Sequence, residues 1–402
     1  MKKKILISTH TLNLGGVERS FIGLLENLDY KKYDVDVFIY QHHGQLFHML
    51  PKKVNLLPEK PSYAALFLPI SEVLAEGQFR VFFAKMVSHL ILKLKSARFR
   101  PDSQKLNSYY HPLYYKVASK FLPEITSKKY DGVLAFLHPN FFEAKINAPL
   151  HLAWIHSDYS QLNFDRKLEL KMWSQFDYIA GVSDLNAEAF MTEFPTLKKK
   201  VFVLENILSP DFVHAQAELD ISDEMPKIEG GYNILSVGRF SYPKNFDSIP
   251  EIARQLKEKG LIFRWYLIGY GSDEGLILEQ IAQHGVNDEV IMLGKKSNPY
   301  PYMRTCDVYI QPSRFEGKAV TVREAQMLGK PVIITNYPSS GSQVEDGVDG
   351  VIVPLDAIGC AKGILKTIRN PELLQHLIEN TTYRKYSNRE EVVKIDLLLQ
   401  SE

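Results

Sequence analysis

Short apolar runs rich in β-branched residues alternate with amphipathic stretches along almost the whole chain. The runs are apolar throughout, and strands of that kind, separated by helices, belong to parallel sheets that are covered on both faces. The pattern therefore predicts an α/β protein and argues against an all-helical or all-β fold. The expected strands are residues 5–9, 35–40, 132–137, 151–155, 178–182, 201–204, 233–237, 263–268, 290–293, 308–311, 332–335 and 351–353, and the clearest expected helices are 17–28, 184–193, 247–257, 273–283 and 320–328.

A chain of 402 residues is long enough for two or three domains. The sequence turns polar and acidic over residues 207–232 and reaches Gly230-Gly231 before the strand–helix alternation restarts. We therefore expect two doubly wound, Rossmann-like domains, residues 1–206 and 207–384. Ligands of open parallel sheets bind outside the carboxyl ends of the strands, so two such sheets facing each other are expected to enclose a cleft.

The charges of the chain almost cancel. Lysine and arginine total 48 against 47 for aspartate and glutamate, a formal net charge of +1. This balance does not attract nucleic acid over the whole surface, so no nucleic-acid partner is expected and any anion site must be local. The two cysteines, Cys306 and Cys360, show no metal-ligand spacing, which indicates a reducing, cytoplasmic setting.

Residues 77–120 differ from the rest of the chain because nine lysines and arginines and eight aromatic residues accompany a single acid, Asp102. Basic and aromatic residues mixed in this way suit an anionic membrane surface, which would make the protein peripheral on the inner face of the cell membrane. The membrane interpretation predicts weaker binding when Arg98, Arg100 and Lys105 are neutralised. The alternative is a solvated basic helix pair whose aromatic residues belong to the core.

Paired glycines, Gly15-Gly16, stand between the first expected strand and the first expected helix. Such glycines let backbone N–H groups approach an anion at the positive end of the helix dipole, although a tight turn alone also selects glycine. The second domain begins in a similar way, with Gly238-Arg239 after its first strand and Lys244 soon afterwards. These two cations either converge on phosphates or are ordinary exposed loop residues.

The densest group of polar residues runs from Pro312 to Ala325. Glu316 follows an expected strand, and Glu324 lies eight residues later in the first two turns of the next expected helix. A carboxylate accepts hydrogen bonds from two adjacent hydroxyl groups, as on a sugar ring or a ribose, and the amides of residues 317–320 at the helix start suit phosphate oxygens. For either glutamate alone, an ordinary surface charge is the competing interpretation.

Several motifs occur in order and at compatible spacing: GGVER after the first strand, then GRFSYPKN, YLIGYGSDEG, LGKKSNPY and DVYIQPSRFEG, with a Glu-x7-Glu pair. Together they resemble the retaining glycosyltransferases of family 4, which have the GT-B fold of two facing Rossmann-like domains, and in particular the branch that builds capsules and exopolysaccharides. The resemblance is strong over residues 233–354, moderate over 1–28 and 151–206, and weak over 40–130, where the acceptor would be recognised.

The resemblance implies catalytic roles for four residues. Arg239 and Lys244 match the pair that binds the donor diphosphate and stabilises the charge developing on the leaving group. Glu316 matches the carboxylate that faces the 3-hydroxyl and anomeric region of the donor sugar, and His156 matches a histidine that contacts the same sugar. The implied route is retaining transfer without a metal or other cofactor, in which the donor β-phosphate helps to deprotonate the acceptor hydroxyl.

Other matching positions imply how the nucleotide-sugar donor is bound. Residues 295–298 match the segment whose backbone receives the base, commonly uracil, and Glu324 matches the carboxylate that holds the ribose. The implied donor-binding residues are Gly16, Gly238, Lys295, Asn298, Gly317, Lys318, Ala319, Val320 and Glu324. The end of the chain, residues 385–402, is expected to form a helix that packs back on the N-terminal domain, as in GT-B proteins, and the alternative is an ordinary surface helix of the second domain.

Two positions depart from the family's pattern. Lys318-Ala319 stand where the common pattern has Phe-Gly, so the family is a weaker guide to the identity of the donor sugar. Tyr270 replaces the usual acid of a Gly-x-Gly loop.

The chain also has Asp34 and Asp36 at the DxD spacing of metal-dependent transferases of another fold. This run reads as an edge strand, so no metal site is inferred.

We therefore expect a glycosyltransferase that moves a sugar from a UDP-sugar to a glycan or lipid-linked glycan in surface polysaccharide synthesis. Two alternatives stay open. A UDP-sugar epimerase on the same fold needs only the donor side, and a non-catalytic nucleotide-sugar-binding partner binds UDP without turnover. Release of UDP that depends on an acceptor distinguishes the transferase from both.

Overall fold

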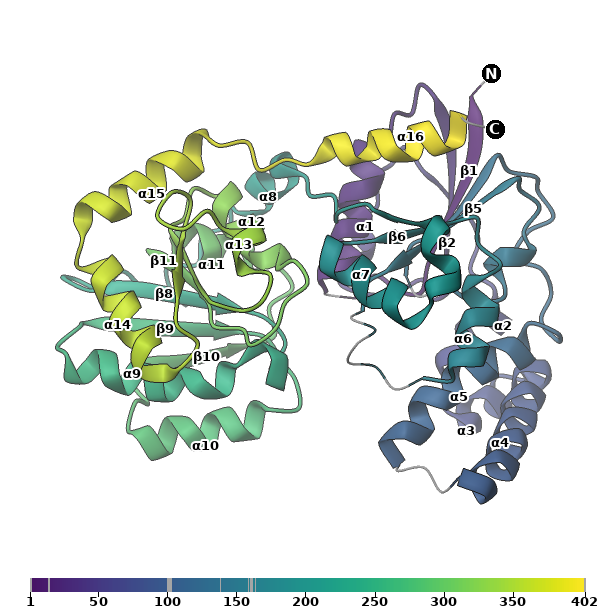
Figure 1. Ribbon diagram of the computed structural model, residues 1–402, viewed down its shortest axis with the longest axis horizontal. Coiled ribbons are helices and arrows are strands. Elements are labelled where there is room, and N and C mark those ends of the chain that lie inside the picture. The colour runs from purple at the N-terminus through teal and green to yellow at the C-terminus, as the bar shows by residue number, and fades with distance from the viewer. Residues whose placement is uncertain are drawn as a thin grey trace. The chain divides into compact units, whose positions relative to one another are not determined.

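The computed structural model describes residues 2–13, 15–99, 103–137, 139–157, 159, 162 and 164–400, without the side chains of residues 95–110. The side chains of Arg98, Arg100, Asp102 and Lys105, on which the membrane interpretation depends, lie outside the described part of the chain. The chain divides into two compact units (Figure 1). Unit 1 comprises Met1–Ile207 and Arg389–Glu402, and unit 2 comprises Leu208–Asn388.

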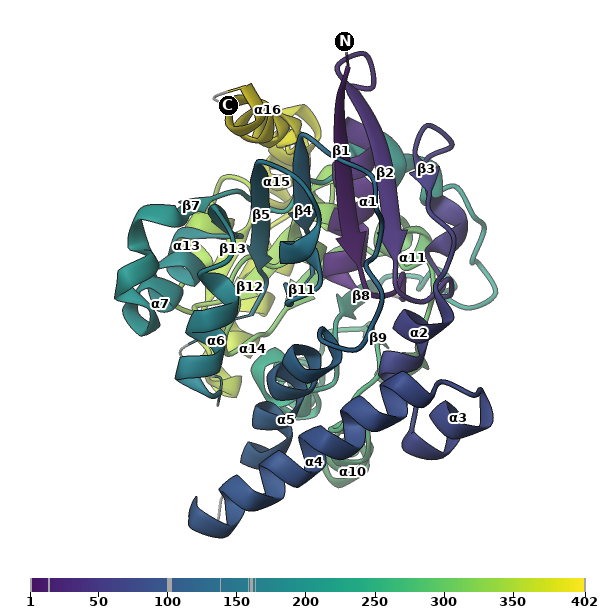
Figure 2. The same cartoon turned by 90° about the vertical axis from the view of Figure 1, so that its right-hand side faces the viewer.

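Unit 1 is built around a parallel sheet (Figures 1 and 2). Among the described residues it has seven strands in the order β3-β2-β1-β4-β5-β6-β7. The strands are β1 (Lys3–Thr9), β2 (Tyr33–Ile39), β3 (Asn55–Leu56), β4 (Gly132–Ala135), β5 (Leu150–Ile155), β6 (Tyr178–Gly181) and β7 (Val201–Val203). The first strand lies between β2 and β4, so the chain winds outward on both sides, as in a Rossmann-like domain.

The helices of unit 1 connect these strands. They are α1 (Gly16–Asn27), α2 (Pro61–Ala64), α3 (Ile70–Ala75), α4 (Phe79–Phe99), α5 (Ser103–Ala118), α6 (Arg166–Trp173), α7 (Asp184–Glu193) and α16 (Val392–Gln400). Side-chain caps fix the starts of two of them: Asp165 accepts a hydrogen bond from the Leu168 amide at α6, and Ser183 accepts one from the Asn186 amide at α7.

Unit 2 contains a second parallel sheet, with six strands in the part of the chain that is described, in the order β10-β9-β8-β11-β12-β13. The strands are β8 (Tyr232–Val237), β9 (Phe263–Ile268), β10 (Val290–Gly294), β11 (Val308–Gln311), β12 (Val332–Thr335) and β13 (Val351–Val353). The helices are α8 (Pro210–Gln216), α9 (Ile249–Glu258), α10 (Glu274–His284), α11 (Tyr300–Thr305), α12 (Val320–Met327), α13 (Ser340–Gln343), α14 (Ala357–Ile368) and α15 (Pro371–Tyr383).

Successive residues on the unit 2 strands face two different apolar layers. Ile234 of β8 packs with residues of α9, α10 and α14, whereas its neighbour Leu235 packs with residues of α8, α11 and α12. Trp265 and Tyr266 of β9 divide between the layers in the same way. Both faces of the sheet are therefore buried, which is why its strands are apolar throughout and readable from the sequence.

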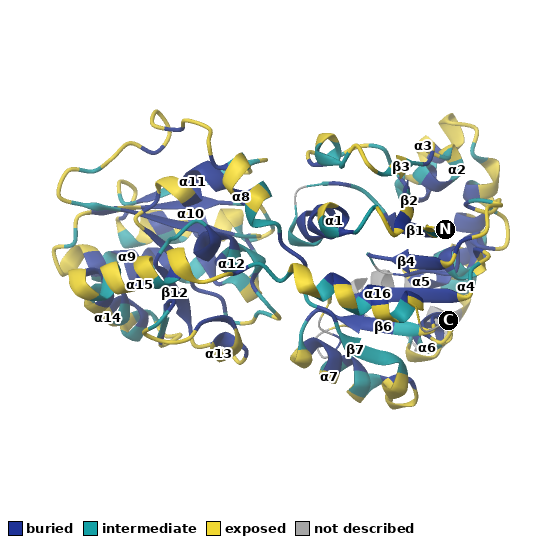
Figure 3. Ribbon diagram, turned by 90° about the horizontal axis from the view of Figure 1, so that it is seen from above, coloured by how far each residue is buried: buried dark blue, intermediate teal, exposed yellow. Residues whose placement is uncertain are grey.

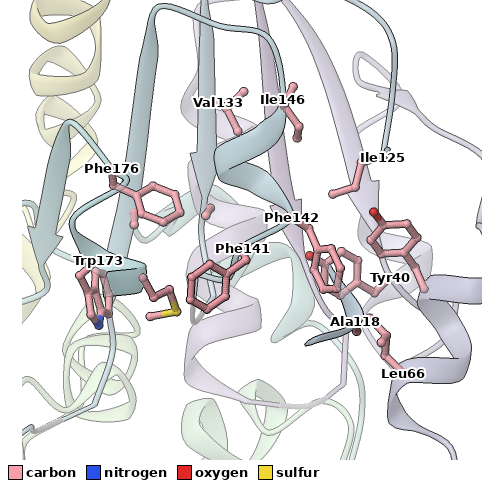
Figure 4. Close-up of a cluster of buried hydrophobic side chains, with 14 of the residues drawn as sticks. Tyr40, Leu66, Ala118, Ile125, Val133, Phe141, Phe142, Ile146, Trp173 and Phe176 are labelled. Atoms are coloured by element: carbon pink, nitrogen blue, oxygen red, sulfur yellow. The ribbon is translucent and has the colours of Figure 1, made fainter. Parts of the chain in front are cut away.

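Aromatic side chains make up much of the unit 1 core (Figure 4). The Tyr63 ring lies 5.5 Å from the Tyr40 ring and 5.1 Å from the Phe142 ring, measured between centroids. Trp173 and Phe176 belong to the same cluster. This packing ties the segments that follow β2 and β4 to the carboxyl end of the sheet.

The expected strands and helices are confirmed to within a few residues at their ends. The interpretation of residues 33–40 as an edge strand is wrong, because β2 pairs on one side with β1 and on the other with the two-residue β3. Asp36 of β2 accepts hydrogen bonds from Lys128 Nζ at 2.8 Å and Tyr130 Oη at 2.7 Å. Burial favours a higher pKa for Asp36, but these bonds and one from Asn55 hold the pKa below its ordinary value.

Helix α16 belongs to unit 1, beside the first strands of the chain. Leu399 is buried against Gly132 of β4, where an added Cβ would lie only 2.6 Å from the Leu399 side chain. Asp396 accepts hydrogen bonds from Tyr33 Oη at 2.7 Å and Lys32 Nζ at 2.6 Å. Apolar packing and a partly buried ion pair therefore both hold the last helix on this unit.

Helix α4 is the longest helix of the described chain and packs against α3 and α5 (Figure 2). Its buried face includes Val81, Ala84 and Ser88. None of the described helices combines the length and the apolar character that crossing a bilayer requires.

The packing of α16 predicts a large difference between two leucine substitutions. Leu399→Ala should lower the free energy of unfolding of unit 1 by about 2–5 kcal/mol, because it removes a buried side chain and leaves a cavity. Leu397 lies on the same helix with 61% of its area exposed, so Leu397→Ala should cost less than about 0.5 kcal/mol. Urea unfolding followed by circular dichroism measures both, and equal losses would contradict the docking of α16 through Leu399.

Candidate functional site

Most of the predicted site residues of unit 2 follow its two central strands, β8 and β11. β8 and β11 are neighbours in the sheet, but β8 leads on to β9 on one side and β11 leads on to β12 on the other. In open α/β sheets, ligands bind at the carboxyl ends of the strands where the connections diverge in this way. Residues 238–245 and 312–318 therefore lie at the edge where this architecture places a ligand.

The loop after β8 is supported by the Gly-x-Gly loop after β9. The Phe240 amide donates a hydrogen bond to the Tyr270 carbonyl at 2.9 Å. A Cβ added to Gly269 would lie 1.9 Å from the Gly238 carbonyl oxygen, so this close approach requires glycine. The close approach of the two loops therefore explains the glycines, whatever residue stands between them. Tyr270 is compatible with the same loop.

Asn245 sets the direction of the loop that carries Lys244. Among the described residues it is the one non-glycine residue with a positive φ, 59°, and it lies between two 3₁₀ turns, Tyr242–Lys244 and Phe246–Ser248. Asparagine tolerates this left-handed conformation better than most residues. Its Nδ2 atom donates to the Pro312 carbonyl at 2.9 Å, which joins the loop after β8 to the loop after β11.

Arg314 joins the same two loops a second time. Its guanidinium makes a bidentate pair with Asp247, with N–O distances of 2.9 and 2.8 Å, and donates to the Tyr242 carbonyl at 2.7 Å. The guanidinium carbon also lies 4.4 Å from the centroid of the Tyr242 ring. A planar, forked cation is needed for this combination, so lysine would not replace Arg314. The hydrogen bond to Asp247 raises the pKa of Arg314.

Lys244 and Glu316, two of the predicted catalytic residues, are in direct contact. Lys244 Nζ lies 2.5 Å from Glu316 Oε1, and Ser313 Oγ donates to the same oxygen at 2.6 Å. The Lys244 side chain is 25% exposed and that of Glu316 is 9% exposed, so the pair is screened less than a surface ion pair. An anion that binds Lys244 must therefore compete with the Glu316 carboxylate.

Glu324 is fully buried in α12 and is reached by a chain of hydrogen bonds from the LGKKSNPY segment. Tyr300 Oη donates to Glu324 Oε1 at 2.7 Å, and the Tyr300 amide donates to Asn298 Oδ1 at 3.1 Å. Asn298 Nδ2 in turn donates to the Gln216 carbonyl at 2.7 Å. The predicted base segment and the predicted ribose carboxylate are thus connected through Tyr300.

The start of α12 carries four predicted donor-binding residues. The Ala319 amide donates to Gln343 Oε1 at 2.8 Å, and Ala319 itself is buried. Gly317 is exposed, and Lys318 and Val320 are half-buried. Because the Ala319 amide is engaged within the protein, the predicted phosphate contact depends on the other three residues.

Two further predicted residues lie at the same carboxyl edge of the sheet. Arg239 is exposed directly after Gly238 at the end of β8. Lys295 follows β10, and its Nζ lies 4.8 Å from the centroid of the Tyr270 ring. Both side chains are therefore presented by loops and are not part of the core.

Gly16 and His156 belong to unit 1. Gly16 begins α1, after the extended Gly15, where an added Cβ would lie 2.2 Å from a Glu18 carboxylate oxygen. His156 follows β5, and its Nε2 donates to the Phe136 carbonyl at 2.6 Å. Burial lowers the pKa of His156 to about 4, so the imidazole is neutral near pH 7 and its Nδ1 is an acceptor. Contact of either residue with a donor sugar stays a prediction.

Four residues that organise the unit 2 site were not predicted as site residues: Asn245, Asp247, Tyr300 and Arg314. All four lie within or beside the motifs quoted above, so the motifs indicated their positions. The sequence did not indicate their hydrogen-bond partners, because each bond joins residues that are distant in the sequence. The motifs pointed to these loops, and the structure shows which side chains hold the loops together.

Comparisons with known proteins point to one family for this unit. Residues 219–384 match the model described as "Glycosyl transferases group 1". A Campylobacter jejuni relative, N-acetylgalactosamine-N,N'-diacetylbacillosaminyl-diphospho-undecaprenol 4-alpha-N-acetylgalactosaminyltransferase, is 25% identical over 210 residues, 52% of this chain and 55% of that protein. The amylovoran biosynthesis glycosyltransferase AmsK of Erwinia amylovora is 30% identical over 129 residues, 30% of this chain and 32% of AmsK. The chain therefore matches at most 55% of the length of these two relatives.

Solved structures resemble the chain over its whole length. Anabaena HepE in complex with UDP and glucose has a TM-score of 0.67 at 15% identity, with 100% of both chains covered. A variant of S. aureus TarM in complex with Fondaparinux, alpha-GlcNAc-glycerol and UDP has a TM-score of 0.66 at 13% identity, again with 100% of both chains covered. At such identities the similarity shows the fold. The chain therefore has the GT-B fold, and residues 219–384 within it match the group 1 glycosyl transferase model.

Proposed function

We propose that this protein is a retaining glycosyltransferase of family 4 that moves a sugar from a UDP-sugar to a glycan or lipid-linked glycan in surface polysaccharide synthesis. The observation that carries the proposal is the contact between Lys244 and Glu316 at the carboxyl edge of the domain that matches the group 1 model. A cation for phosphate and an acceptor for sugar hydroxyls lie there side by side, as transfer from a nucleotide-sugar requires.

The names of similar proteins support the donor and the acceptor class. HepE and TarM are both seen with UDP, which supports uracil as the base. The Campylobacter jejuni relative is named for a diphospho-undecaprenol acceptor, and AmsK is named for amylovoran biosynthesis. The first name supports a lipid-linked glycan acceptor for the present chain, and the second supports a role in polysaccharide synthesis.

The proposed reaction breaks the bond between the anomeric carbon and the diphosphate and forms a glycosidic bond to the acceptor oxygen. The acceptor proton passes to an oxygen of the donor β-phosphate on the same face of the sugar, so the configuration is retained. Arg239 and Lys244 stabilise the charge that grows on the diphosphate, and the start of α12 adds backbone dipoles. Glu324 holds the ribose, and no metal or other cofactor is proposed.

The proposed function predicts that a UDP-sugar raises the thermal unfolding midpoint more than GDP- or ADP-sugars do. A ligand at 100 times its Kd adds about 2.7 kcal/mol to the stability of the folded state. Release of UDP should then rise when a lipid-linked glycan is added. An isomerised sugar formed without acceptor would indicate an epimerase instead, and UDP binding with no turnover under either condition would indicate a non-catalytic partner.

Arg239→Ala and Lys244→Ala should each lower kcat by about 10²–10³, because each removes a cation that stabilises the leaving diphosphate. The thermal midpoint without ligand should change little for Arg239→Ala, whose side chain is exposed, and should fall for Lys244→Ala, which leaves the Glu316 carboxylate without its cation. Lys362→Ala, an exposed lysine of α14, is the matched control and should keep full turnover. Unchanged turnover in both site variants would refute the diphosphate assignment.

Tyr300→Phe tests the connection to Glu324 with the loss of a single oxygen. The variant should weaken UDP binding by about 5–10-fold, because one hydrogen bond to a buried carboxylate is lost, while kcat at saturating donor stays close to the wild-type value. Isothermal titration with UDP and donor-dependent kinetics measure the two effects. Tyr232→Phe, which removes a hydroxyl group that donates to the Ile368 carbonyl, is the control. Equal UDP affinity in all three proteins would show that Tyr300 does not position Glu324.

A further inference from the structure

Helix α4 presents a line of large apolar side chains that unit 1 does not cover. The exposed fractions are 68% for Phe79, 53% for Phe83, 47% for Met86, 58% for Leu90 and 66% for Leu94. At 3.6 residues per turn and 1.5 Å per residue, these five positions span about 80° of the helix circumference and about 22 Å of its length. They form one stripe, which we call the α4 stripe, on the side opposite Val81, Ala84 and Ser88.

The α4 stripe is apolar, but its borders are basic. Arg80 and Lys93 are exposed and lie on opposite sides of the stripe on the helical wheel. The helix contains no aspartate or glutamate along its 21 residues. The acids nearest to it in the sequence are Glu76, three residues before its start, and Asp102, three residues after its end.

The stripe continues onto the segment after α5. The Phe83 and Phe121 rings meet edge to face, with centroids 5.3 Å apart and an interplanar angle of 83°. Lys120, beside Phe121, is exposed. The apolar surface is therefore broader than one helix and again has a cation at its edge.

We propose that α4 lies flat on an anionic lipid bilayer, with the α4 stripe at the boundary between headgroups and acyl chains. Arg80 and Lys93 then reach the lipid phosphates from both sides of the stripe, since long basic side chains extend toward the headgroups. Each basic residue near such a surface adds to the attraction. The proposal does not depend on the proposed function, because lipid binding requires neither donor nor acceptor.

Charge favours a bilayer over a second copy of this chain. Two α4 stripes packed together would bring the arginine and lysine borders of both copies close to each other, with no acid on the helix to pair with them. An anionic surface instead complements the same borders. The geometry also suits a flat target, because the stripe runs straight along the helix with an exposed basic residue on each side of it.

Sedimentation of the full chain with phosphatidylglycerol vesicles and with phosphatidylcholine vesicles tests the proposal. The wild-type chain should bind the anionic vesicles more tightly, and the double variant Leu90→Ser/Leu94→Ser should bind them at least about tenfold less tightly. The control, Leu276→Ser/Leu278→Ser, changes two leucines of α10 that are 44% and 52% exposed and should bind like the wild type. Arg80→Gln/Lys93→Gln should reduce the preference for the anionic vesicles.

A fluorescence measurement detects directly whether the α4 stripe enters the lipid surface. The three native tryptophans, Trp154, Trp173 and Trp265, are all buried, so a Phe79→Trp side chain would supply the exposed signal. Its emission should shift to shorter wavelength with phosphatidylglycerol vesicles.

Equal vesicle binding by the wild-type chain and Leu90→Ser/Leu94→Ser, both with the same thermal midpoint, would overturn the proposal. A dimer in solution that the double serine variant dissolves would also overturn it, in favour of contact between two copies.

Discussion

The burial of both faces of each sheet is the constraint on which the rest of this structure depends. In unit 2, neighbouring residues such as Ile234 and Leu235 pack into different apolar layers, so neither face of the sheet can carry polar chemistry. Charged groups that could meet a ligand therefore lie at the ends of the strands, and a hydroxyl group within a strand, such as that of Ser236, is bonded inside the protein, to the Ile310 carbonyl. Because β8 and β11 are neighbours with divergent connections, their two loops receive most of these groups.

Those loops lack regular secondary structure over most of their length, so side chains must hold them. Asn245 bonds to Pro312, and Arg314 makes a bidentate pair with Asp247. These bonds fix the backbone on both sides of Lys244 and limit the conformational freedom that the loop would otherwise have. The rigid geometry places the Lys244 ammonium within 2.5 Å of Glu316, whose carboxylate belongs to the other loop.

The sequence allowed the strands to be predicted, because these depend on continuous apolar runs, and local motifs pointed to the loops in which we place the site. The two-residue β3 is too short to give a recognisable sequence pattern, so β2 was wrongly expected at the edge of the sheet. The bond between Tyr300 and Glu324 joins two helices, and no local pattern reports it. The α4 stripe was also hidden, because α4 is apolar on its buried side as well, and only the exposure of each residue separates the two faces.

The ion pair between Lys244 and Glu316 links two functions under the proposed reaction. Without an anion, each charge has its partner in the other, and neither is left uncompensated in a partly buried position. A diphosphate that binds Lys244 supplies a new partner for the ammonium and releases the Glu316 carboxylate from that bond. The carboxylate, still held by Ser313, can then accept hydrogen bonds from sugar hydroxyls. The arrival of the phosphate and the recognition of the sugar are in this way coupled through one oxygen atom, Oε1 of Glu316.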